Sequence, residues 1–336
     1  MLNILFTCAG RRTYLINYFK EALNGKGLVF AGDLSPTAPA LVEADRAIVF
    51  PSIYDSNYIP KLKSAIVKYN IYAVISLNDL ELPLLAKHKL ELETTGTKVI
   101  ISSERVIDLS YDKMKTHNFI ESIGLNSPAT YTSLETVKNA LNSEELNFPL
   151  VIKPRWGSAS LGLEFANNME ELELILKLQT LKINNLLKEA KIPSTFNELI
   201  IQEKIPGQEY GMDIVNDFEG NYVGTFVRKK MNMRSGETDK AVSIIAPMFE
   251  ECGKQISEKL GHIGNLDCDV FQVKDKLFVL ELNPRFGGGY PFSHEAGVNT
   301  SAMYIEWLQG HKNVSQFINY KPDVMCSKCD RLLRIN

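Results

Sequence analysis

Over about the first hundred residues, short apolar runs alternate with amphipathic stretches, and this alternation constrains the fold more than any other feature of the chain. Short apolar runs suit buried strands, whereas apolar residues three and four apart suit helices that cover one face of a sheet. Strands and helices in such succession form a parallel sheet, so an open α/β unit is expected. Its strands are predicted at residues 3–7, 28–32, 47–50, 73–76 and 98–101, and its helices at 13–23, 56–69 and 80–92.

The pattern changes near residue 111 to an α+β arrangement. Two alternating runs, at 199–205 and 210–215, flank a segment with Pro206 and Gly207, and this turn chemistry predicts a hairpin-like pair of strands. Helices are predicted at 111–123, 134–141, 170–178, 181–190 and 247–260, and further strands at 148–153, 222–229, 241–245, 269–273 and 277–282.

Length and charge limit the function classes. A chain of 336 residues is longer than one hydrophobic core usually serves, so two or three packed subdomains are expected. A formal net charge of -3 gives no general attraction to nucleic acid, and no apolar run approaches the ~18 residues of a membrane span. Residues 2–6 form a short apolar run without a basic segment before it, which is typical of a first strand and not of a signal sequence.

Cysteine usage indicates the compartment. Five cysteines, an odd number, argue against a disulfide framework and for a reducing environment, so a cytoplasmic protein is expected. Cys326 and Cys329 have the spacing of half a zinc site, but they lack a second pair or nearby histidines, and no zinc is expected there. Of the scattered histidines, His294 is the one placed where it could face a substrate.

A segment near the N-terminus imitates a dinucleotide-binding site. Gly10 lies in a strand-to-helix turn, and Asp33 follows the next strand, where an acidic residue can bind a ribose. Only one of the three glycines of that fingerprint is present, so an NAD-dependent oxidoreductase is a disfavoured reading. The turn then serves the fold, and Arg11 or Arg12 could meet a small anion at the N-terminus of the following helix.

A lysine at the end of a strand and a loop of small residues form the first part of a predicted nucleotide site. Lys153 ends the strand, and the loop runs from Gly157 to Gly162. A lysine offers a compact positive charge to phosphate oxygens, and glycines let backbone N–H groups approach them closely. Lys113 is a second candidate cation for the same phosphates.

The alternating run at residues 200–205 is the candidate adenine site. An extended strand exposes backbone N–H and C=O groups beside an apolar wall, and such groups suit the edge of an adenine. Glu209, beyond the turn, could accept hydrogen bonds from both ribose hydroxyls. A plain hairpin without a ligand is the alternative interpretation.

Three oxygen-bearing side chains are predicted to meet on neighbouring strands. Glu281 and Asn283 are two residues apart and so project from the same face of one strand, where Asp269 on the preceding strand can join them. Hard oxygen ligands together with phosphates suit Mg²⁺, and buried carboxylates without a cation would be costly. The sequence therefore predicts a magnesium site.

Arg285, directly after this metal motif, is predicted to be catalytic together with Asn283. A planar guanidinium can bind phosphate oxygens bidentately and stabilise the charge that moves with a phosphoryl group. The glycine run that follows, with Gly288 at its centre, allows an anionic substrate to lie against the backbone. The basic run at 228–240, which includes Arg228 and Arg234, is expected to be a strand end and loop that contacts phosphate or a substrate carboxylate, although such runs are commonly just solvated.

These segments, in this order, resemble the ATP-grasp enzymes, and most of all one synthetase half of the large subunit of carbamoyl phosphate synthetase. The resemblance runs from Met1 to about Gly310, and the Glu-Leu-Asn-Pro-Arg motif at 281–285 is its most specific part. It implies a Rossmann-like pre-ATP-grasp domain followed by a two-part ATP-grasp fold with a small lid subdomain and a C-terminal antiparallel sheet. The implied boundaries are 1–110 for the first domain, 111–200 for the part with the lid, 201–312 for the C-terminal part and 313–336 for a tail.

The resemblance also implies roles for single residues. Lys113 and Lys153 would contact phosphates and adenine, Glu209 the ribose, and Arg285 the reactive phosphate. The metal would be Mg²⁺, with two ions expected and Mn²⁺ as an alternative, held by Asp269, Glu281 and Asn283. The remaining ATP-binding residues would be Gly157, Ser158, Ala159, Ser160 and Gly162 in the loop, and Gln202, Glu203, Lys204 and Ile205 in the strand.

The implied activity is a ligase that joins a carboxylate to an amine or ammonia through an acyl phosphate, with small-molecule partners only. A homodimer is compatible with the sequence. A complete large subunit resembles two such halves in tandem plus an allosteric region, whereas this chain has one half. Synthesis of carbamoyl phosphate with a partner subunit is therefore an alternative to a single-unit ligase. An ATP-binding regulatory module without turnover is the rival from another class of protein.

Overall fold

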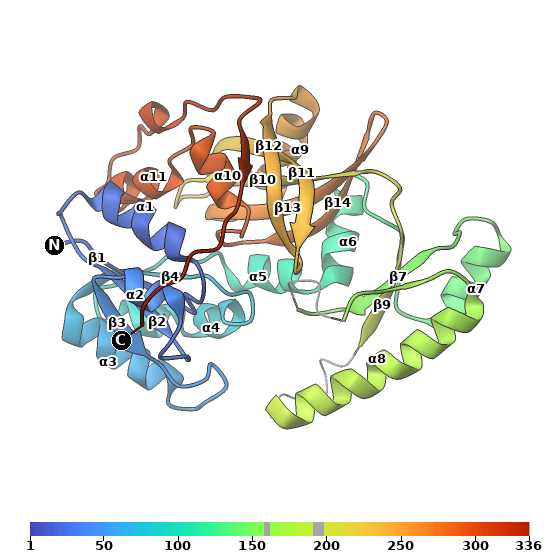
Figure 1. The fold of residues 1–336 in the computed structure, drawn as a ribbon, viewed down its shortest axis with the longest axis horizontal. Helices are drawn as coiled ribbons and strands as arrows, with labels where there is room; N and C mark the ends of the chain where they lie inside the picture. Colours follow the sequence, from blue (N-terminus) through green and yellow to red (C-terminus); the bar gives the residue numbers. More distant parts are fainter. Residues whose placement is uncertain (158–161, 191–197, 336) are drawn as a thin grey trace.

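The computed structural model describes residues 1–157, 162–190 and 198–335, except for the side chains of residues 186–190. Within these residues the chain forms one parallel and two antiparallel sheets, which build three neighbouring parts of the molecule (Figure 1). The predicted combination of α/β and α+β architecture is confirmed.

The N-terminal part is a parallel sheet with helices on both faces. Its strands are β1 (Asn3–Thr7), β2 (Val29–Asp33), β3 (Arg46–Val49), β4 (Ile71–Ser76) and β5 (Lys98–Val99), and its helices are α1 (Thr13–Leu23), α2 (Pro39–Glu43), α3 (Tyr58–Tyr69) and α4 (Leu82–Glu93). The strand order is β3-β2-β1-β4-β5. Ligands of such sheets bind beyond the carboxyl ends of the strands where the order reverses, which here is between β1 and β4. The loops that follow these two strands therefore lie where a ligand is expected.

Side chains of β1 enter two different cores. Ile4 and Phe6 belong to the core that packs α1, and Leu5 belongs to the core that packs α3 and α4. Every residue of β1 is buried, because a strand covered on both faces has no solvent side. This double burial is the physical reason for the short continuous apolar runs in the sequence.

The C-terminal part is an antiparallel sheet in the order β14-β13-β10-β11-β12-β15. These strands are β10 (Gln208–Asn216), β11 (Tyr222–Arg234), β12 (Glu237–Ile244), β13 (Gly264–Val273), β14 (Lys276–Asn283) and β15 (Met325–Ser327), and the helices around them are α9 (Pro247–Leu260), α10 (Tyr290–Glu295), α11 (Thr300–Leu308) and the short η2 (Ser315–Phe317). Helix α9 lies on one face of this sheet, and its predicted bounds are confirmed.

The two faces of this sheet differ sharply in chemistry. Met212, Val227 and Cys268 point into the apolar core beneath α9. Their neighbours along the same strands, Asp213 and Arg228 among them, therefore point to the opposite face. Because apolar and charged residues alternate along these strands, one face of the sheet is apolar and the other carries buried charged side chains.

The third part is a small antiparallel sheet at one end of the molecule, with the long helix α8 along its outer side (Figure 1). It consists of β6 (Thr130–Tyr131), β7 (Leu150–Pro154), β8 (Glu164–Ala166) and β9 (Leu199–Glu203) in the order β6-β9-β7-β8, with α7 (Leu134–Asn142) and α8 (Met169–Ala190). The two helices predicted at 170–178 and 181–190 are wrong, because α8 is continuous through both. In the described part of the chain, no helix is long and apolar enough to cross a membrane.

The predicted hairpin between residues 199–205 and 210–215 is also wrong. Strand β9 pairs with β6 and β7, whereas β10 pairs with β11 and β13. The segment with Pro206 and Gly207 therefore carries the chain from one sheet to another. Turn residues specify a local change of direction, but they do not specify which strands pair.

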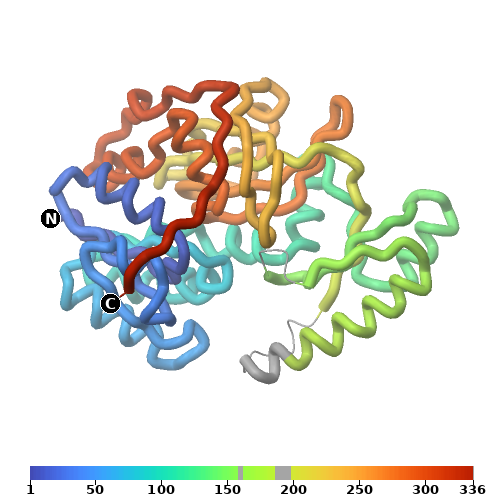
Figure 2. Tube along the Cα trace, in the orientation of Figure 1, coloured from blue at the N-terminus to red at the C-terminus, as the bar shows by residue number. Residues whose placement is uncertain are grey.

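The basic run at 228–240 is a β-hairpin in the structure and not a strand end followed by a loop. Strand β11 continues to Arg234, and β12 begins at Glu237. The C-terminal tail then adds β15 to the free edge of β12. Beyond β15 the tail descends across the molecule to the N-terminal part (Figure 2), where Asp330 contacts Arg11.

Asp112 links two helices to the small four-stranded sheet. The helices are α5 (Glu104–Tyr111) and α6 (Lys113–Ser122), and Asp112 caps α6 by accepting hydrogen bonds from the N–H groups of Met114 and Lys115. Arg155, just after β7, donates to both carboxylate oxygens of Asp112 at 2.8 and 2.7 Å. The Asp112 side chain is 4% exposed. This contact fixes the start of α6, and with it Lys113, against the end of β7.

We expect Asp112→Ala to lower the free energy of unfolding by about 2 kcal/mol or more, of which roughly 1 kcal/mol comes from the lost helix cap and the rest from the two lost hydrogen bonds to Arg155, which keeps only Glu198 as a carboxylate partner among the described residues. Asp108→Ala is the matched control, because Asp108 is exposed and pairs only with Lys115 among the described residues, and such surface pairs contribute little. Urea denaturation of the two variants measures the difference. Equal stability of both variants would contradict the structural role of Asp112.

Candidate active site

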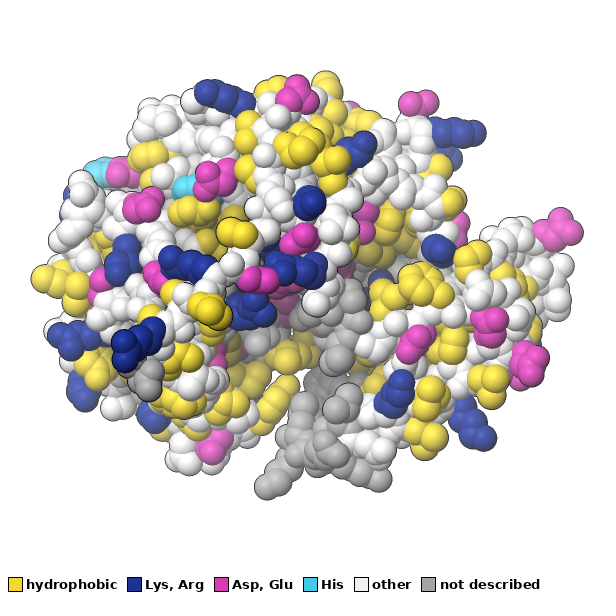
Figure 3. Space-filling view, in the orientation of Figure 1, with side chains coloured by type: hydrophobic (Ala, Val, Ile, Leu, Met, Phe, Trp, Pro, Cys, Tyr) yellow, Lys and Arg dark blue, Asp and Glu magenta, His cyan; other side chains and the backbone are white. Residues whose placement is uncertain are grey.

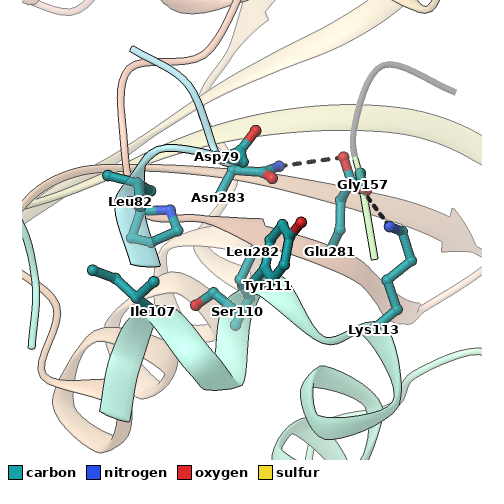
Figure 4. Close-up of a pocket in the computed structure, with 11 residues that line it drawn as sticks. Asp79, Leu82, Ile107, Ser110, Tyr111, Lys113, Gly157, Glu281, Leu282 and Asn283 are labelled. Carbon is teal, nitrogen blue, oxygen red and sulfur yellow. Dashed lines mark hydrogen bonds between the residues drawn. The ribbon is translucent and has the colours of Figure 1, made fainter. Parts of the chain in front are cut away.

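Two cavities meet between the N-terminal part and the six-stranded sheet. The first is a narrow slot whose lining includes Tyr111, Lys113, Gly157 and Asn283 (Figure 4). The second is a polar cavity of about 320 Å³, lined by the loops after β1 and β4 and by the charged face of the six-stranded sheet. Asp79 and Glu281 line both. The two spaces are therefore continuous parts of one candidate site.

The three predicted metal ligands come together. Asp269 on β13 lies opposite Glu281 on β14, and the Asn283 amide donates a hydrogen bond of 3.2 Å to Glu281 Oε1 (Figure 4). Within the described residues, no group of three or more His, Cys, Asp or Glu side chains is placed to hold a metal ion. Mg²⁺ commonly uses one or two carboxylates and completes its shell with phosphate and water. The two carboxylates and the side-chain oxygen Oδ1 of Asn283, which has no hydrogen-bond partner among the described residues, fit that pattern.

The charge around Asp269 favours a cation. Burial, together with the carboxylates of Asp267, Glu281 and Glu209, raises the pKa of Asp269 to about 7, although Lys230 acts in the opposite direction. Lys230 Nζ lies 2.6 Å from Asp269 and 2.7 Å from Glu209. The Lys230 ammonium group is thus shared between Asp269 and Glu209. A divalent cation at Asp269 and Glu281 would relieve the repulsion between the neighbouring carboxylates.

Both predicted phosphate lysines face this carboxylate cluster. Lys113 Nζ donates to the Gly157 carbonyl at 2.5 Å. Lys153, on β7, is 6% exposed, and its side chain has no hydrogen-bond or ion-pair partner among the described residues. Burial lowers the pKa of Lys153 to about 8, while Glu281 acts in the opposite direction. A buried ammonium without a partner is costly, and an anionic ligand would remove that cost.

The predicted adenine strand is in place, with its side chains already engaged. Gln202 is buried and donates to Thr130 Oγ1 at 2.8 Å, and Glu203 accepts a hydrogen bond from the N–H of Ala129. Lys204 is exposed and lies over the Phe165 ring. The ladder between β7 and β9 ends at Glu203. The backbone groups of the next two residues, including the buried Ile205, therefore lie beyond the paired strand, as an adenine edge requires.

Three further residues predicted to bind ATP are Glu209, Gly162 and Gly157. Glu209 belongs to β10, and its carboxylate binds Lys230. Gly162 has a φ of +71°, a conformation that glycine adopts without strain, and it packs near Pro154 and Gln179. Gly157 lines the slot. The predicted loop residues Ser158, Ala159 and Ser160 lie outside the described residues.

Arg285 belongs to a buried series of ion pairs in which aspartates and arginines alternate. Its guanidinium contacts Asp79 at 2.7 Å and Asp267 at 3.1 Å. Asp267 also binds Arg228 at 2.6 Å, and Arg228 binds Asp213 at 2.6 Å. Among the described residues, Nε of both arginines and Oδ1 of Asp79 have no hydrogen-bond partner. Arg285 is therefore held from both sides and keeps a donor for a ligand.

The predicted substrate residues Arg228 and Arg234 have different surroundings from those expected. Arg228 is 1% exposed and engaged by two carboxylates, so it positions Arg285 through Asp267. Arg234 lies near the tip of the β11–β12 hairpin and pairs with Asp239 and Asp330 at the surface. It is not part of the described lining of either cavity.

The glycine run has a physical requirement that the sequence reasoning missed. A Cβ at Gly287 would lie 2.1 Å from Asp267, and one at Gly289 would lie 2.2 Å from Arg228. The charged side chains therefore pack directly on the backbone of this run. Gly288 differs, because its added Cβ would meet only the ends of Glu237 and Arg12, at 3.0 and 3.2 Å.

Four charged lining residues were not named by the sequence analysis: Asp79, Glu237, Lys230 and Asp267. A signal for two of them exists, since Lys230 follows Arg228 by two positions and Asp267 precedes Asp269 by two, so each shares a strand face with a predicted residue. Asp79 comes from the loop after β4, and nothing in the local sequence connects it with Arg285. Only the packing of the N-terminal part brings them together.

Two other sequence motifs lie apart from the chemistry. Asp33 accepts hydrogen bonds from the N–H groups of Gly10 and Ser35, so it closes the turn that the NAD reading would use for a ribose. His294 stacks on Tyr18 with a centroid distance of 3.6 Å and is not part of the described cavity linings. Neither motif supports an oxidoreductase or a histidine-based site.

The fold and a family model identify an ATP-grasp domain in this chain. Residues 195–331 match the family model described as ATP-grasp in the biosynthetic pathway with Ter operon, and residues 4–100 match the PylC-like N-terminal domain. The chain therefore carries an ATP-grasp domain behind a PylC-like N-terminal domain, and the predicted membership of the ATP-grasp ligase superfamily is confirmed.

The likeness to the large subunit of carbamoyl phosphate synthetase is confirmed as well. The large chain of that enzyme from Campylobacter jejuni is 24% identical over 264 residues, which cover 73% of this chain and 23% of the relative. The large chain from Haemophilus ducreyi is 23% identical over 243 residues, or 70% of this chain and 21% of the relative. This chain thus spans under a quarter of the length of these curated relatives.

Solved structures share the fold over nearly the whole chain. An L-amino acid ligase from Bacillus licheniformis has a TM-score of 0.71 at 19% identity, covering 96% of this chain and 79% of that one. The biotin carboxylase domain of a 2-oxoglutarate carboxylase from Hydrogenobacter thermophilus, in complex with MgADP and bicarbonate, has a TM-score of 0.71 at 16% identity, covering 93% of this chain and 70% of that one. At these identities the likeness establishes the fold.

We expect Gly289→Ala to lower the free energy of unfolding by about 2–3 kcal/mol, because the new Cβ overlaps Arg228 and overpacking in a filled interior costs about this much. Gly289 has a φ of −86°, so alanine brings no backbone strain and the loss reports the clash alone. Gly288→Ala is the neighbouring control, since it meets only flexible side-chain ends, and it should unfold with nearly the wild-type free energy. Denaturant titration compares the three proteins. A stable Gly289→Ala variant would contradict the described packing of Arg228.

Proposed function

We propose that the protein is an ATP- and Mg²⁺-dependent ligase that joins a carboxylate to an amine or ammonia through an acyl phosphate. One observation carries this proposal: Asp269, Glu281 and Asn283 gather beside Arg285 and face the buried Lys153, whose side chain has no hydrogen-bond or ion-pair partner in the described part of the chain. Oxygen ligands for a metal, cations for phosphates and a guanidinium at the junction of two cavities together support phosphoryl transfer to a second substrate.

The first step is phosphoryl transfer, and it takes place in the narrow slot and where the slot meets the polar cavity. A carboxylate oxygen of the substrate attacks the γ-phosphorus of ATP, a P–O bond forms, and the bond to ADP breaks. Lys113 and Lys153 attract the phosphates, while Arg285, fixed by Asp79 and Asp267, stabilises the charge that moves with the phosphoryl group. Mg²⁺, with two ions proposed on Asp269, Glu281 and Asn283, would neutralise negative charge on the phosphates.

The second step belongs to the polar cavity. The amine nitrogen attacks the acyl carbon, a C–N bond forms, the C–O bond to phosphate breaks, and the nitrogen loses a proton. No protein nucleophile is needed. Enclosure matters here, because water in the cavity would hydrolyse the acyl phosphate. The position of the cavity between the N-terminal part and the six-stranded sheet supports such enclosure.

The substrates are the least constrained part of the proposal. The relatives of known structure include a ligase of L-amino acids and an enzyme crystallised with bicarbonate. Carbamoyl phosphate synthesis with a partner subunit is the alternative, because the curated relatives are large chains of that synthase. A phosphate-release screen with ATP, Mg²⁺ and paired carboxylates and amines, including bicarbonate with ammonia, separates these reactions by the mass of the product.

We expect Glu281→Gln to reduce ADP formation at least about a hundredfold, because the amide removes one of the two carboxylates offered to Mg²⁺ and leaves the shape unchanged. Glu258→Gln, on the exposed side of α9, is the matched control and should keep wild-type turnover. ADP release is measured with each productive substrate pair, and circular dichroism checks the fold. Full activity of the Glu281 variant would remove the site assignment. ATP binding to wild type without ADP release over the whole substrate panel would favour a regulatory module.

The affinity for ATP should depend on pH through Lys153. Its pKa is lowered to about 8 by burial, and a bound triphosphate favours the charged form, so the affinity is fully present below about pH 8 and falls above it. The KM for ATP of wild type should therefore rise between about pH 8 and pH 9.5, approaching tenfold per unit. Lys153→Arg should lack this rise, because a guanidinium stays charged over that range. A flat wild-type profile, or the same profile in both proteins, would contradict the role of Lys153.

A further inference from the structure

The polar cavity has an end that the phosphoryl transfer does not use. Arg12, Gly288 and Glu237 line this end. Arg12 comes from the turn between β1 and α1 in the N-terminal part, Gly288 from the glycine run, and Glu237 from the β11–β12 hairpin. Figure 3 shows that basic and acidic side chains gather on the face where the C-terminal segment meets the N-terminal part.

Arg12 is a sheltered guanidinium with few partners. Its side chain is 19% exposed, and the nearest carboxylate oxygen, on Glu237, is 3.9 Å away. Nη1 donates to the Tyr14 hydroxyl at 3.0 Å, and that hydroxyl donates in turn to the Gly287 carbonyl at 3.3 Å. A guanidinium has five N–H donors, so most of those on Arg12 have no acceptor among the described residues.

The other arginines of the cavity are engaged differently. Arg228 and Arg285 are held by buried carboxylates, and Arg11 is 83% exposed and pairs with Asp330. Arg12 and Arg285 are near enough for each charge to act on the other. Arg285 is already held by two carboxylates, whereas Arg12 has no carboxylate oxygen closer than 3.9 Å among the described residues. An anionic group of a ligand at this end of the cavity would therefore pair with Arg12.

The space beside Arg12 is kept open by Gly288. A Cβ at this residue would approach the Glu237 carboxylate to 3.0 Å and Arg12 Nη1 to 3.2 Å. The end of the cavity therefore presents a cation and an anion on either side of a bare backbone. Glu237 is itself paired with Lys328 at 3.1 Å, so Arg12 is the charged group at this end that has donors left over among the described residues. A carboxylate, which a guanidinium can bind with two parallel hydrogen bonds, suits it.

We propose that Arg12 binds a carboxylate of the acceptor, so that the nitrogen nucleophile is a carboxylate-bearing amine such as an amino acid, and not ammonia. This inference rests on the proposed ligase function. The volume of the cavity, about 320 Å³, supports it, because pockets that enclose small organic ligands begin near 300 Å³, and ammonia needs far less room. Arg12 then orients the acceptor while its amine points toward the acyl phosphate at Arg285.

The experiment compares acceptors that differ only in the carboxylate. Wild-type protein receives ATP, Mg²⁺ and a panel of donor carboxylates, with L-alanine against ethylamine, glycine against methylamine, and ammonia. Hydroxylamine is added in separate reactions, where it traps an acyl phosphate as a hydroxamate without needing a carboxylate. We expect ligation with the amino acids at least tenfold above that with the matched amines and ammonia.

Variants then assign this preference to Arg12. Arg12→Met should raise the KM for the amino acid about a hundredfold and should lower ligation relative to hydroxamate formation by a similar factor. Arg12→Lys keeps the charge, and its KM for the amino acid should lie between those of wild type and Arg12→Met. Gly288→Ala should raise the same KM by narrowing the space. Arg46→Met is the matched control, because Arg46 is exposed on β3 and lies outside the described linings of both cavities, and it should keep the wild-type ratio of ligation to hydroxamate.

Each failure has a distinct signature. Hydroxamate formation together with equal use of amines, ammonia and amino acids overturns the role of Arg12 and leaves the ligase proposal standing. An Arg12→Met variant whose KM rises for the donor carboxylate, and not for the acceptor, overturns it as well. If wild type forms neither ADP nor hydroxamate with any donor, the ligase proposal itself fails.

Discussion

The site depends on a buried chain of alternating charges that runs from Asp213 through Arg228, Asp267 and Arg285 to Asp79. Each inner member of this chain contacts two opposite charges, which is how ionised groups can remain away from water without shifting to the neutral form. Four of the five residues come from the six-stranded sheet and the segment that follows it, and the fifth comes from the N-terminal part. The contact between Arg285 and Asp79 therefore both orients Arg285 and joins the two parts, alongside the apolar core that they share. Removal of Arg228 or Arg285 would leave Asp213 or Asp79, respectively, without its arginine partner.

The sheet supplies the platform on which this chain lies. Alternate residues of β10, β11 and β13 bury apolar side chains under α9 and turn charged ones to the other face, so the helix that stabilises the domain also determines which side chains reach the ligand. The glycine run lies so close to the charged groups that a side chain at Gly287 would overlap Asp267 and one at Gly289 would overlap Arg228. Of these three glycines, Gly288 is the one beside open space. This space lies between Arg285, where the phosphoryl transfer is proposed, and Arg12, which has few partners.

Much of the local structure could be predicted from periodicity, and the failures have identifiable causes. Strand β1 and helices α1 and α9 have the predicted bounds, because their apolar spacing reports burial directly. The hairpin prediction failed because Pro206 and Gly207 describe a turn, while the partners of β9 and β10 are chosen by two different sheets. The basic run at 228–240 was predicted to be a strand end and a loop in contact with phosphate or a substrate carboxylate, whereas it forms a hairpin. In the structure, Arg228 and Lys230 are buried and neutralised by carboxylates from neighbouring strands.

By itself, the sequence determined the succession of strands and helices, the common face of Glu281 and Asn283, and the assignment to the ATP-grasp proteins, because these follow from spacing along one strand or one motif. The tertiary structure alone decided that Asp79 holds Arg285, that Arg228 is held by two buried carboxylates, and that Arg12 looks into the cavity. The contacts of Asp79 with Arg285 and of Arg12 with Glu237 join residues more than two hundred positions apart, and burial and charge pairing act through space, where no local pattern records the partner.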